Sequence, residues 1–187
     1  MSKLRIIGGE LKGRKLISVP GTDIRPTADR IRESIFNILA GRVGGAVVLD
    51  LFAGTGALGI EALSRGAESA FFIEINKRAL SVLKRNINTC SVGNKVTIIQ
   101  WNILENLTCI QSMRPAFNLV FMDPPYNKHL IGPSLSNLHD SGCLESGACV
   151  TIEHSHLEPI AEGPLPFNVF DQRRYAKTLV SFLSYML

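Results

Sequence analysis

The chain has 187 residues, of which 45% are hydrophobic and 19% are charged. This length predicts one compact domain with a small appendage at most, and this composition excludes wholesale disorder. No apolar run approaches the roughly 20 residues that a membrane helix needs, and the charged N-terminus lacks the apolar core of a signal peptide. We therefore expect a monomeric cytoplasmic protein with no membrane partner.

The net charge of +4 is concentrated in the N-terminal quarter of the chain. Residues 1–45 hold nine Lys and Arg against four Asp and Glu, whereas the remaining residues hold eleven against twelve. This asymmetry indicates a polyanionic partner, although a solvated basic extension fits the charge about equally well. We divide the chain accordingly into an N-terminal basic hairpin and helix, residues 1–45, and a main domain, residues 46–187.

The N-terminal segment predicts a small hairpin followed by a helix. Residues 4–7 and 15–19 are apolar or β-prone and are separated by glycines, so we expect two short strands. Thr27 is a candidate N-cap, because an apolar stripe at helical spacing follows it. The stripe consists of Ile31, Ile35, Ile38 and Leu39, and Arg30 and Arg32 lie off it.

From residue 46 onward, segments with strand character alternate with segments of helical periodicity. The expected strands are residues 46–51, 69–74, 96–100, 117–123 and 148–153, and the expected helices are residues 57–65, 76–89 and 134–139. Two further strands, residues 167–171 and 179–185, follow each other without a helix between them. This order predicts an α/β fold with a doubly wound, Rossmann-like, seven-stranded and mostly parallel sheet that ends in an antiparallel C-terminal hairpin.

The first turn from strand to helix carries a glycine motif. Gly54, Gly56 and Gly59 fit the pattern G-x-G-x-x-G, and Glu74 ends the next expected strand, twenty residues after Gly54. Glycines let the backbone approach a ligand closely, and an acid at the second strand end accepts hydrogen bonds from ribose hydroxyls. The motif indicates a cofactor that contains a nucleoside without saying which one, and any tight turn of this kind can also use glycines for structure alone.

The segment Asp123-Pro124-Pro125-Tyr126 follows a buried apolar strand and says the most about the substrate. Two prolines end the strand, and they leave an acceptor-rich edge made of the Asp123 carboxylate and the Pro124 carbonyl. With the Tyr126 ring as a flat face, this set suits a planar base that carries an exocyclic NH2 group. These three residues are the candidate catalytic residues.

Two features favour S-adenosylmethionine (SAM) over a dinucleotide. Asp50 precedes the glycine turn, where its charge would attract the ammonium and sulfonium of SAM but repel a pyrophosphate. The Asp123 segment ends the fourth strand, across the crevice in which open α/β sheets bind ligands, and a hydride-transfer enzyme has no clear use for it.

On these residues the chain resembles the class I SAM-dependent methyltransferases. More narrowly, it resembles the RsmD family, which methylates the exocyclic N2 of one guanine in bacterial 16S ribosomal RNA. The resemblance covers nearly the whole chain and implies SAM as cofactor and ribosomal RNA or the small ribosomal subunit as partner. It is carried by Arg5-Ile6-Ile7-Gly8-Gly9, Lys12-Gly13-Arg14, Arg25-Pro26-Thr27, Arg30, Arg32, Glu33, Phe36, Asn37, the turn of residues 50–59, Asp123–Tyr126 and Glu153.

The resemblance also implies which residues bind the cofactor and the RNA. The cofactor residues it implies are Asp50, Phe52, Ala53, Gly54, Gly56, Glu74, Ile75, Asn102, Ile103 and Asp123. The candidate RNA contacts are Arg5, Lys12, Arg14, Arg25, Arg30 and Arg32. No metal site is implied, because the four histidines and the cysteines Cys90, Cys109, Cys143 and Cys149 show no metal-ligand spacing.

The chain departs from the family pattern at two positions. Asn102 stands after the third strand, where such enzymes commonly carry an aspartate that accepts from the adenine N6 of SAM. An asparagine oxygen can also accept, although without charge assistance. Ala176 stands in the tail where we expect a glycine, which concerns the local turn rather than the chemistry.

Other functions stay open at this point. A DNA adenine-N6 methyltransferase uses a similar element, but the short segment between Tyr126 and Ala148 leaves little room for a target-recognition insertion. A protein-glutamine methyltransferase would carry Asn at position 123. A non-catalytic RNA-binding assembly factor would not need the intact acids Asp50, Glu74 and Asp123, and a nicotinamide oxidoreductase would not need the Asp123 segment.

Overall fold

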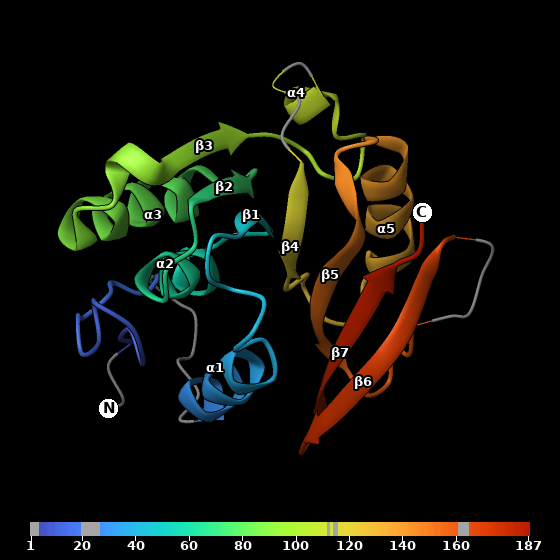
Figure 1. Ribbon diagram of the computed structural model, residues 1–187, viewed down its shortest axis with the longest axis horizontal. Helices are drawn as coiled ribbons and strands as arrows, with labels where there is room; N and C mark the ends of the chain where they lie inside the picture. Colours follow the sequence, from blue (N-terminus) through green and yellow to red (C-terminus); the bar gives the residue numbers. More distant parts are fainter. Residues whose placement is uncertain (1–3, 20–26, 112, 114–115, 161–164) are drawn as a thin grey trace.

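A seven-stranded sheet forms the centre of the computed structural model, which describes residues 4–19, 27–111, 113, 116–160 and 165–187 (Figure 1). The strand order is β3-β2-β1-β4-β5-β7-β6. The strands are β1 (Val47–Leu51), β2 (Ser69–Glu74), β3 (Val96–Gln100), β4 (Phe117–Met122), β5 (Leu144–Ser155), β6 (Phe167–Tyr175) and β7 (Thr178–Tyr185). The helices are α1 (Thr27–Ile38), α2 (Ala57–Ser64), α3 (Lys77–Cys90), α4 (Thr108–Gln111) and α5 (Ile131–Asp140), with a 3₁₀ turn at Gly93–Lys95.

Strands β1 to β5 run parallel, and the chain order reverses beside β1, which pairs with both β2 and β4. Strand β7 pairs antiparallel with both β5 and β6, so the last two strands form the expected C-terminal hairpin. A reversal of strand order opens a crevice at the carboxyl ends of the flanking strands. The predicted α/β fold is therefore confirmed, and the rule places the ligand-binding edge where β1, β2 and β4 end.

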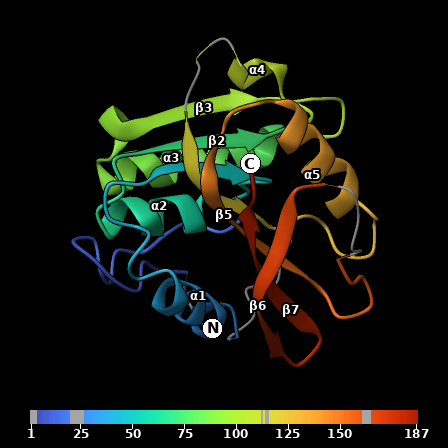
Figure 2. The ribbon, with the colours of Figure 1, turned by 45° about the vertical axis from the view of Figure 1, so that its right-hand side comes forward.

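Side chains of the central strands alternate between two apolar cores, one on each face of the sheet. Val48 and Phe72 belong to the core under α1, α2 and α3, whereas Leu49 and Ile73 belong to the core under α4 and α5. Figures 1 and 2 show these helices on opposite faces. Strands that are covered on both faces have continuous apolar sequences. This explains why their positions could be predicted well from the sequence. Among the described residues, no helix has the length and apolar character that crossing a membrane requires.

The two strands predicted for residues 4–7 and 15–19 are not regular strands. The structure has a single antiparallel bridge between Arg5 and Lys15, flanked by two backbone hydrogen bonds of 2.9 and 2.8 Å. The N–H groups of Ile7 and Gly8 instead donate to the Glu61 carboxylate on α2, at 2.7 Å each. Residues 4–16 are thus held by side chains of α2 rather than by a strand ladder.

Helix α1 includes Thr27 as its first residue, so the prediction of Thr27 as the N-cap was wrong. The apolar stripe is confirmed at Ile31, Ile35 and Leu39, which are at most 4% exposed, whereas Ile38 is half-buried. Outside α1, the element boundaries shift by a few residues, and α4 was not predicted. Helix α5 begins at Ile131 rather than at residue 134, because a proline is tolerated in the first helical turn.

The hairpin of β6 and β7 extends toward α1, and both views show its turn beside that helix (Figures 1 and 2). The Tyr175 hydroxyl bonds to the Ser34 hydroxyl of α1 there. The next residue, Ala176, adopts a left-handed conformation with φ of 55°. This conformation explains why a glycine is expected at position 176, since a side chain disfavours left-handed backbone angles.

Replacing Ala176 by glycine should stabilise the protein by up to about 1 kcal/mol. The substitution relieves roughly 1–2 kcal/mol of left-handed strain, of which the greater freedom of glycine in the unfolded chain takes back about half. Urea denaturation measures the change, with Ala40→Gly as the control at an exposed alanine outside the left-handed region. A loss of stability in Ala176→Gly that equals the loss in Ala40→Gly would show that the turn is unstrained.

Candidate active site

The turn after β1 contains three residues with left-handed backbone conformation, and it leaves open space beside Gly54. Phe52, Gly54 and Gly56 have φ angles of 60°, 56° and 77°. A Cβ atom on Gly56 would lie 2.3 Å from Leu83 Cδ1, so packing requires that glycine. A Cβ on Gly54 would meet only the Phe52 carbonyl oxygen, at 3.8 Å. The backbone at Gly54 therefore faces space that a ligand can fill.

Glu74, at the end of β2, is tied to this turn. The Gly54 N–H donates to Glu74 Oε2 at 2.9 Å, and the Asn76 N–H donates to Oε1 at 2.8 Å. Each carboxylate oxygen keeps a second lone pair, so both remain able to accept from a ribose diol. The next residue, Ile75, is 55% exposed, which is unusual for an isoleucine beside a sheet and gives an apolar face for a ring. These residues fit an adenosine group.

Asp50 is buried beneath the turn, with 2% of its surface exposed. Its Oδ2 atom accepts from the Gly59 N–H at 2.9 Å. Burial raises the pKa of Asp50 to about 8, against the lowering effect of that hydrogen bond, and the Glu74 carboxylate raises the pKa further. The ionised form is disfavoured until a cation lies nearby, so the site suits a ligand with positive charge.

Asp123 stands at the open carboxyl edge, directly after β4. Within the described part of the chain, no hydrogen bond reaches its carboxylate. Although the residue is exposed, the surrounding protein desolvates its carboxyl group and raises its pKa well above the usual value. The carboxylates of Glu153 and Asp50 raise the pKa further. Asp123 is a free acceptor in a crowded acidic site, and Pro124 beside it is buried.

Tyr126 is fixed by the two strands that flank the acidic site. Its hydroxyl donates to Glu153 Oε1 on β5 at 2.8 Å and lies 3.2 Å from Thr178 Oγ1 on β7. Burial raises the pKa of Tyr126, and the neighbouring Glu153 raises it further, so the phenol stays protonated at neutral pH. The ring is half-buried. A tyrosine held at its hydroxyl offers a ring of fixed orientation for stacking.

Asn102 and Ile103 follow β3, the neighbour of β2 at this edge. Asn102 Oδ1 accepts from the Leu104 N–H at 3.2 Å, and its Nδ2 group donates to Glu105 at 2.8 Å. The amide oxygen is thus engaged in a local turn and has one lone pair left for a ligand. Ile103 is 3% exposed, so its side chain belongs mainly to the core.

The basic residues named as RNA contacts divide into two groups. Arg5, Lys12, Arg14 and Arg30 are exposed on the N-terminal segment and on α1. Arg32 is 5% exposed, and its guanidinium bonds to Asp29 Oδ1 at 3.0 Å and to the Arg5 carbonyl at 2.7 Å. Burial and these partners leave the Arg32 guanidinium less accessible to a phosphate than the other four side chains, and its role as an RNA contact stays a prediction. Arg25 lies outside the described residues.

Two residues that organise the site were not singled out for these roles from the sequence. Glu61 is fully buried on α2 and holds the N-terminal segment. Its signal was available in the sequence, because Glu61 is the only charged residue of α2, whose other residues are apolar except Ser64. Glu158 is 8% exposed and accepts from the Asn127 N–H at 2.7 Å, which fixes the loop after Tyr126. No local pattern marked that residue.

Comparisons with known proteins agree with this geometry. The chain is 40% identical over 151 residues to ribosomal RNA small subunit methyltransferase D of Escherichia coli K12, covering 81% of this chain and 74% of the relative. Among solved structures, the E. coli protein yhhF, which carries a provisional methyltransferase name, matches with a TM-score of 0.84 and 31% identity over 99% of both chains.

A more distant structure, SMU.776 in complex with SAH, matches with a TM-score of 0.65 over 86% of this chain and 50% of its own. At 15% identity it shows a shared fold alone. The model of the family described as conserved hypothetical protein 95 matches residues 4–184. The chain therefore belongs to that family, the RsmD family whose motifs it carries.

Proposed function

We propose that the chain transfers a methyl group from SAM to the exocyclic N2 of a guanine in small-subunit ribosomal RNA. The observation that carries the proposal is the Asp123 carboxylate at the carboxyl edge, which no hydrogen bond from the described residues reaches, beside the anchored Tyr126 ring. The name of the E. coli relative supports ribosomal RNA as the substrate class. The exposed Arg5, Lys12 and Arg14 support a polyanionic partner on the N-terminal segment.

The residues around the glycine turn fit SAM. Glu74 would hold the ribose hydroxyls, Ile75 would face the adenine, and Asp50 would lie beneath the positive charge. When bound, SAM supplies an electrophilic methyl group on a positively charged sulfur. What the protein adds is alignment, since a displacement at carbon requires the nucleophile opposite the leaving group.

The Asp123 segment would prepare the nucleophile. A guanine N2 is a poor nucleophile, because its lone pair is delocalised into the ring. The Asp123 carboxylate and the Pro124 carbonyl accept hydrogen bonds from its N–H groups and so localise that lone pair on nitrogen. The new bond between nitrogen and methyl carbon would form as the bond between sulfur and methyl carbon breaks. The Asp123 carboxylate would stabilise the positive charge on the nitrogen until N2 gives up one proton to solvent. The Tyr126 ring, held by Glu153 and Thr178, stacks on a base that has left its helix.

Transfer of label from methyl-labelled SAM tests the proposal. The acceptors are naked 16S ribosomal RNA, isolated small ribosomal subunits and duplex DNA, and the product nucleosides are separated after digestion. We expect N2-methylguanosine from one or both RNA substrates. N6-methyladenine from the DNA would instead establish the DNA enzyme, and SAM-independent RNA binding without transfer would establish an assembly factor.

Asp50 should couple SAM binding to proton release. Because the raised pKa leaves Asp50 protonated at pH 7, a bound cation that favours the ionised form expels that proton, and affinity rises as pH increases toward 8. Calorimetry at pH 7 in two buffers of different ionisation enthalpy counts the protons. The Asp50→Asn variant keeps an acceptor for the Gly59 N–H and should release fewer protons than the wild type. Equal release from both proteins would show that Asp50 does not titrate on binding.

A further inference from the structure

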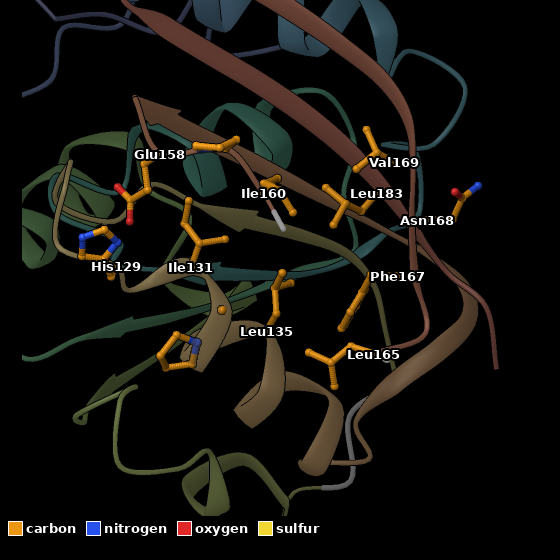
Figure 3. A pocket seen from close by; sticks show the side chains of 13 residues that line it. His129, Ile131, Leu135, Glu158, Ile160, Leu165, Phe167, Asn168, Val169 and Leu183 are labelled. Carbon is orange, nitrogen blue, oxygen red and sulfur yellow. The ribbon is translucent and has the colours of Figure 1, made fainter. Parts of the chain in front are cut away.

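A pocket with a volume of about 540 Å³ lies between α5 and the β6–β7 hairpin (Figure 3). None of the residues named above for the cofactor, for catalysis or for RNA contact lines this pocket. Its walls are mostly aliphatic. They include Ile131 and Leu135 from α5, Ile160 and Leu165 from the segments that follow β5 and precede β6, Phe167 from β6 and Leu183 from β7.

One end of the pocket is polar. Figure 3 shows the side chains of Glu158 and His129 there, pointing toward one another. Glu158 is 8% exposed, and its Oε2 atom accepts from the Asn127 N–H. Its Oε1 atom is buried and has no hydrogen-bond partner among the residues that the structure describes. A buried carboxylate oxygen without a donor has lost its hydration and gained no hydrogen bond in exchange, which destabilises the folded protein. A ligand that donates to it would remove that penalty.

The polar end adjoins the candidate active site. Asn127 directly follows Tyr126, and both Asn127 and His129 are in the left-handed region, with φ of 56° and 55°. The turn that carries Glu158 is held from the other side, since the ring Nδ1 of buried His154 lies 2.8 Å from the Glu158 carbonyl oxygen. The pocket is therefore joined to the catalytic loop through one fixed hydrogen bond.

A ligand for this pocket needs apolar faces and N–H donors at one edge. An unstacked nucleobase has both, because its ring faces are apolar and its edge carries amino or imino groups. The ring would lie between Ile131 and Ile160, with its donor edge at Glu158. The last torsion of a glutamate is soft, so the carboxylate can turn one oxygen toward the pocket while the other keeps the Asn127 N–H. Exposed Lys128 stands next to this end for a phosphate.

We propose that this pocket binds a second, unstacked nucleobase of the RNA chain, near the guanine that is methylated. The inference rests on the proposed function, because its location argument uses the catalytic loop. The second base contact would help to select the substrate, because only an RNA with two unstacked bases at the right distance from each other fills both sites. Burial of one base face against aliphatic side chains, with one hydrogen bond, corresponds to a change in affinity of about ten-fold or more.

Gly132→Leu tests this proposal by filling the pocket. Gly132 lines the pocket on α5, and a Cβ placed on it meets no atom within 4 Å. Gly41→Leu is the matched control, since a Cβ there also meets nothing and Gly41 does not line the pocket. We expect Gly132→Leu to lower kcat/KM for 16S ribosomal RNA about ten-fold or more, with SAM affinity and melting temperature unchanged, and Gly41→Leu to match the wild type.

The outcomes separate this inference from the proposed function. Wild-type transfer to ribosomal RNA together with wild-type rates in Gly132→Leu would overturn the pocket and leave the function standing. A loss confined to assembled subunits, with naked RNA unaffected, would assign the pocket to a protein side chain instead. If the wild type transfers no methyl to RNA, the methyl NMR signals of Ile131 and Ile160 still decide the point. They shift when a short single-stranded RNA containing guanine enters the pocket, and they stay in place if it does not.

Discussion

The Asp123→Ala variant should lose methyl transfer by at least about 100-fold while its affinity for SAM changes little. Removing one group that stabilises charge in the transition state typically lowers kcat by about 10²–10³. Asp123 has no hydrogen-bond partner in the described part of the chain to compensate, and it follows β4 rather than the glycine turn that would hold most of SAM. Labelled transfer measures the rate, and calorimetry measures SAM binding on the same preparation.

Two further variants make this result specific. Asp123→Asn keeps an acceptor oxygen and loses the charge, so it should fall between the wild type and alanine. The raised pKa of Asp123 also implies that the wild-type rate increases with pH, as the carboxylate ionises, and Asp123→Asn should lose this dependence. Asp140→Ala removes an exposed aspartate at the end of α5 and should leave the rate unchanged. Near-normal turnover in Asp123→Ala would remove Asp123 from the mechanism.

The parts of the site that could be predicted from sequence are those set by local pattern. Buried parallel strands are continuous apolar runs, so the ends of β1, β2 and β4 were located, and with them Asp50, Glu74 and Asp123. The carboxyl ends of these strands meet at one edge by topology alone. Glycines at Gly54 and Gly56 follow from the left-handed backbone that the turn requires.

The parts that were missed depend on contacts between residues far apart in the chain. Arg30 and Arg32 both lie off the apolar stripe of α1, yet only Arg30 is exposed. Arg32 is buried because Glu61 of α2 and the N-terminal segment pack against it. Helical periodicity within α1 gives no information about these contacts. The anchoring of Tyr126 by Glu153 and Thr178 joins β5 and β7 in the same way. Such partners become visible only once the strand order is known.

Glu61→Ala should have the largest effect on stability, with a loss of roughly 3–5 kcal/mol in the free energy of unfolding. Glu61 is fully buried and accepts from the N–H groups of Ile7 and Gly8 and from Arg65 Nε, each at 2.7 Å. Burial lowers the pKa of Arg32, and the charges of Glu61 and Asp29 oppose that effect. Alanine therefore leaves two backbone donors unpaired and removes one of the three carboxylates, Glu61, Asp29 and Glu153, whose charges favour the ionised form of Arg32. Urea denaturation measures the loss.

The control is Glu68→Ala, which removes an exposed glutamate just beyond α2 and should change the free energy of unfolding by less than about 0.5 kcal/mol. Hydrogen exchange then tells a local effect from a global one. Because Glu61 bonds directly to Ile7 and Gly8, their amides should lose protection in Glu61→Ala before those of β1 and β4 do. Glu61→Gln keeps the acceptor oxygen without the charge, so it should recover part of that protection. If the amides of the N-terminal segment stay protected in Glu61→Ala, the segment is held by its apolar contacts, Leu4, Ile6 and Leu16, and the buried carboxylate is not its anchor.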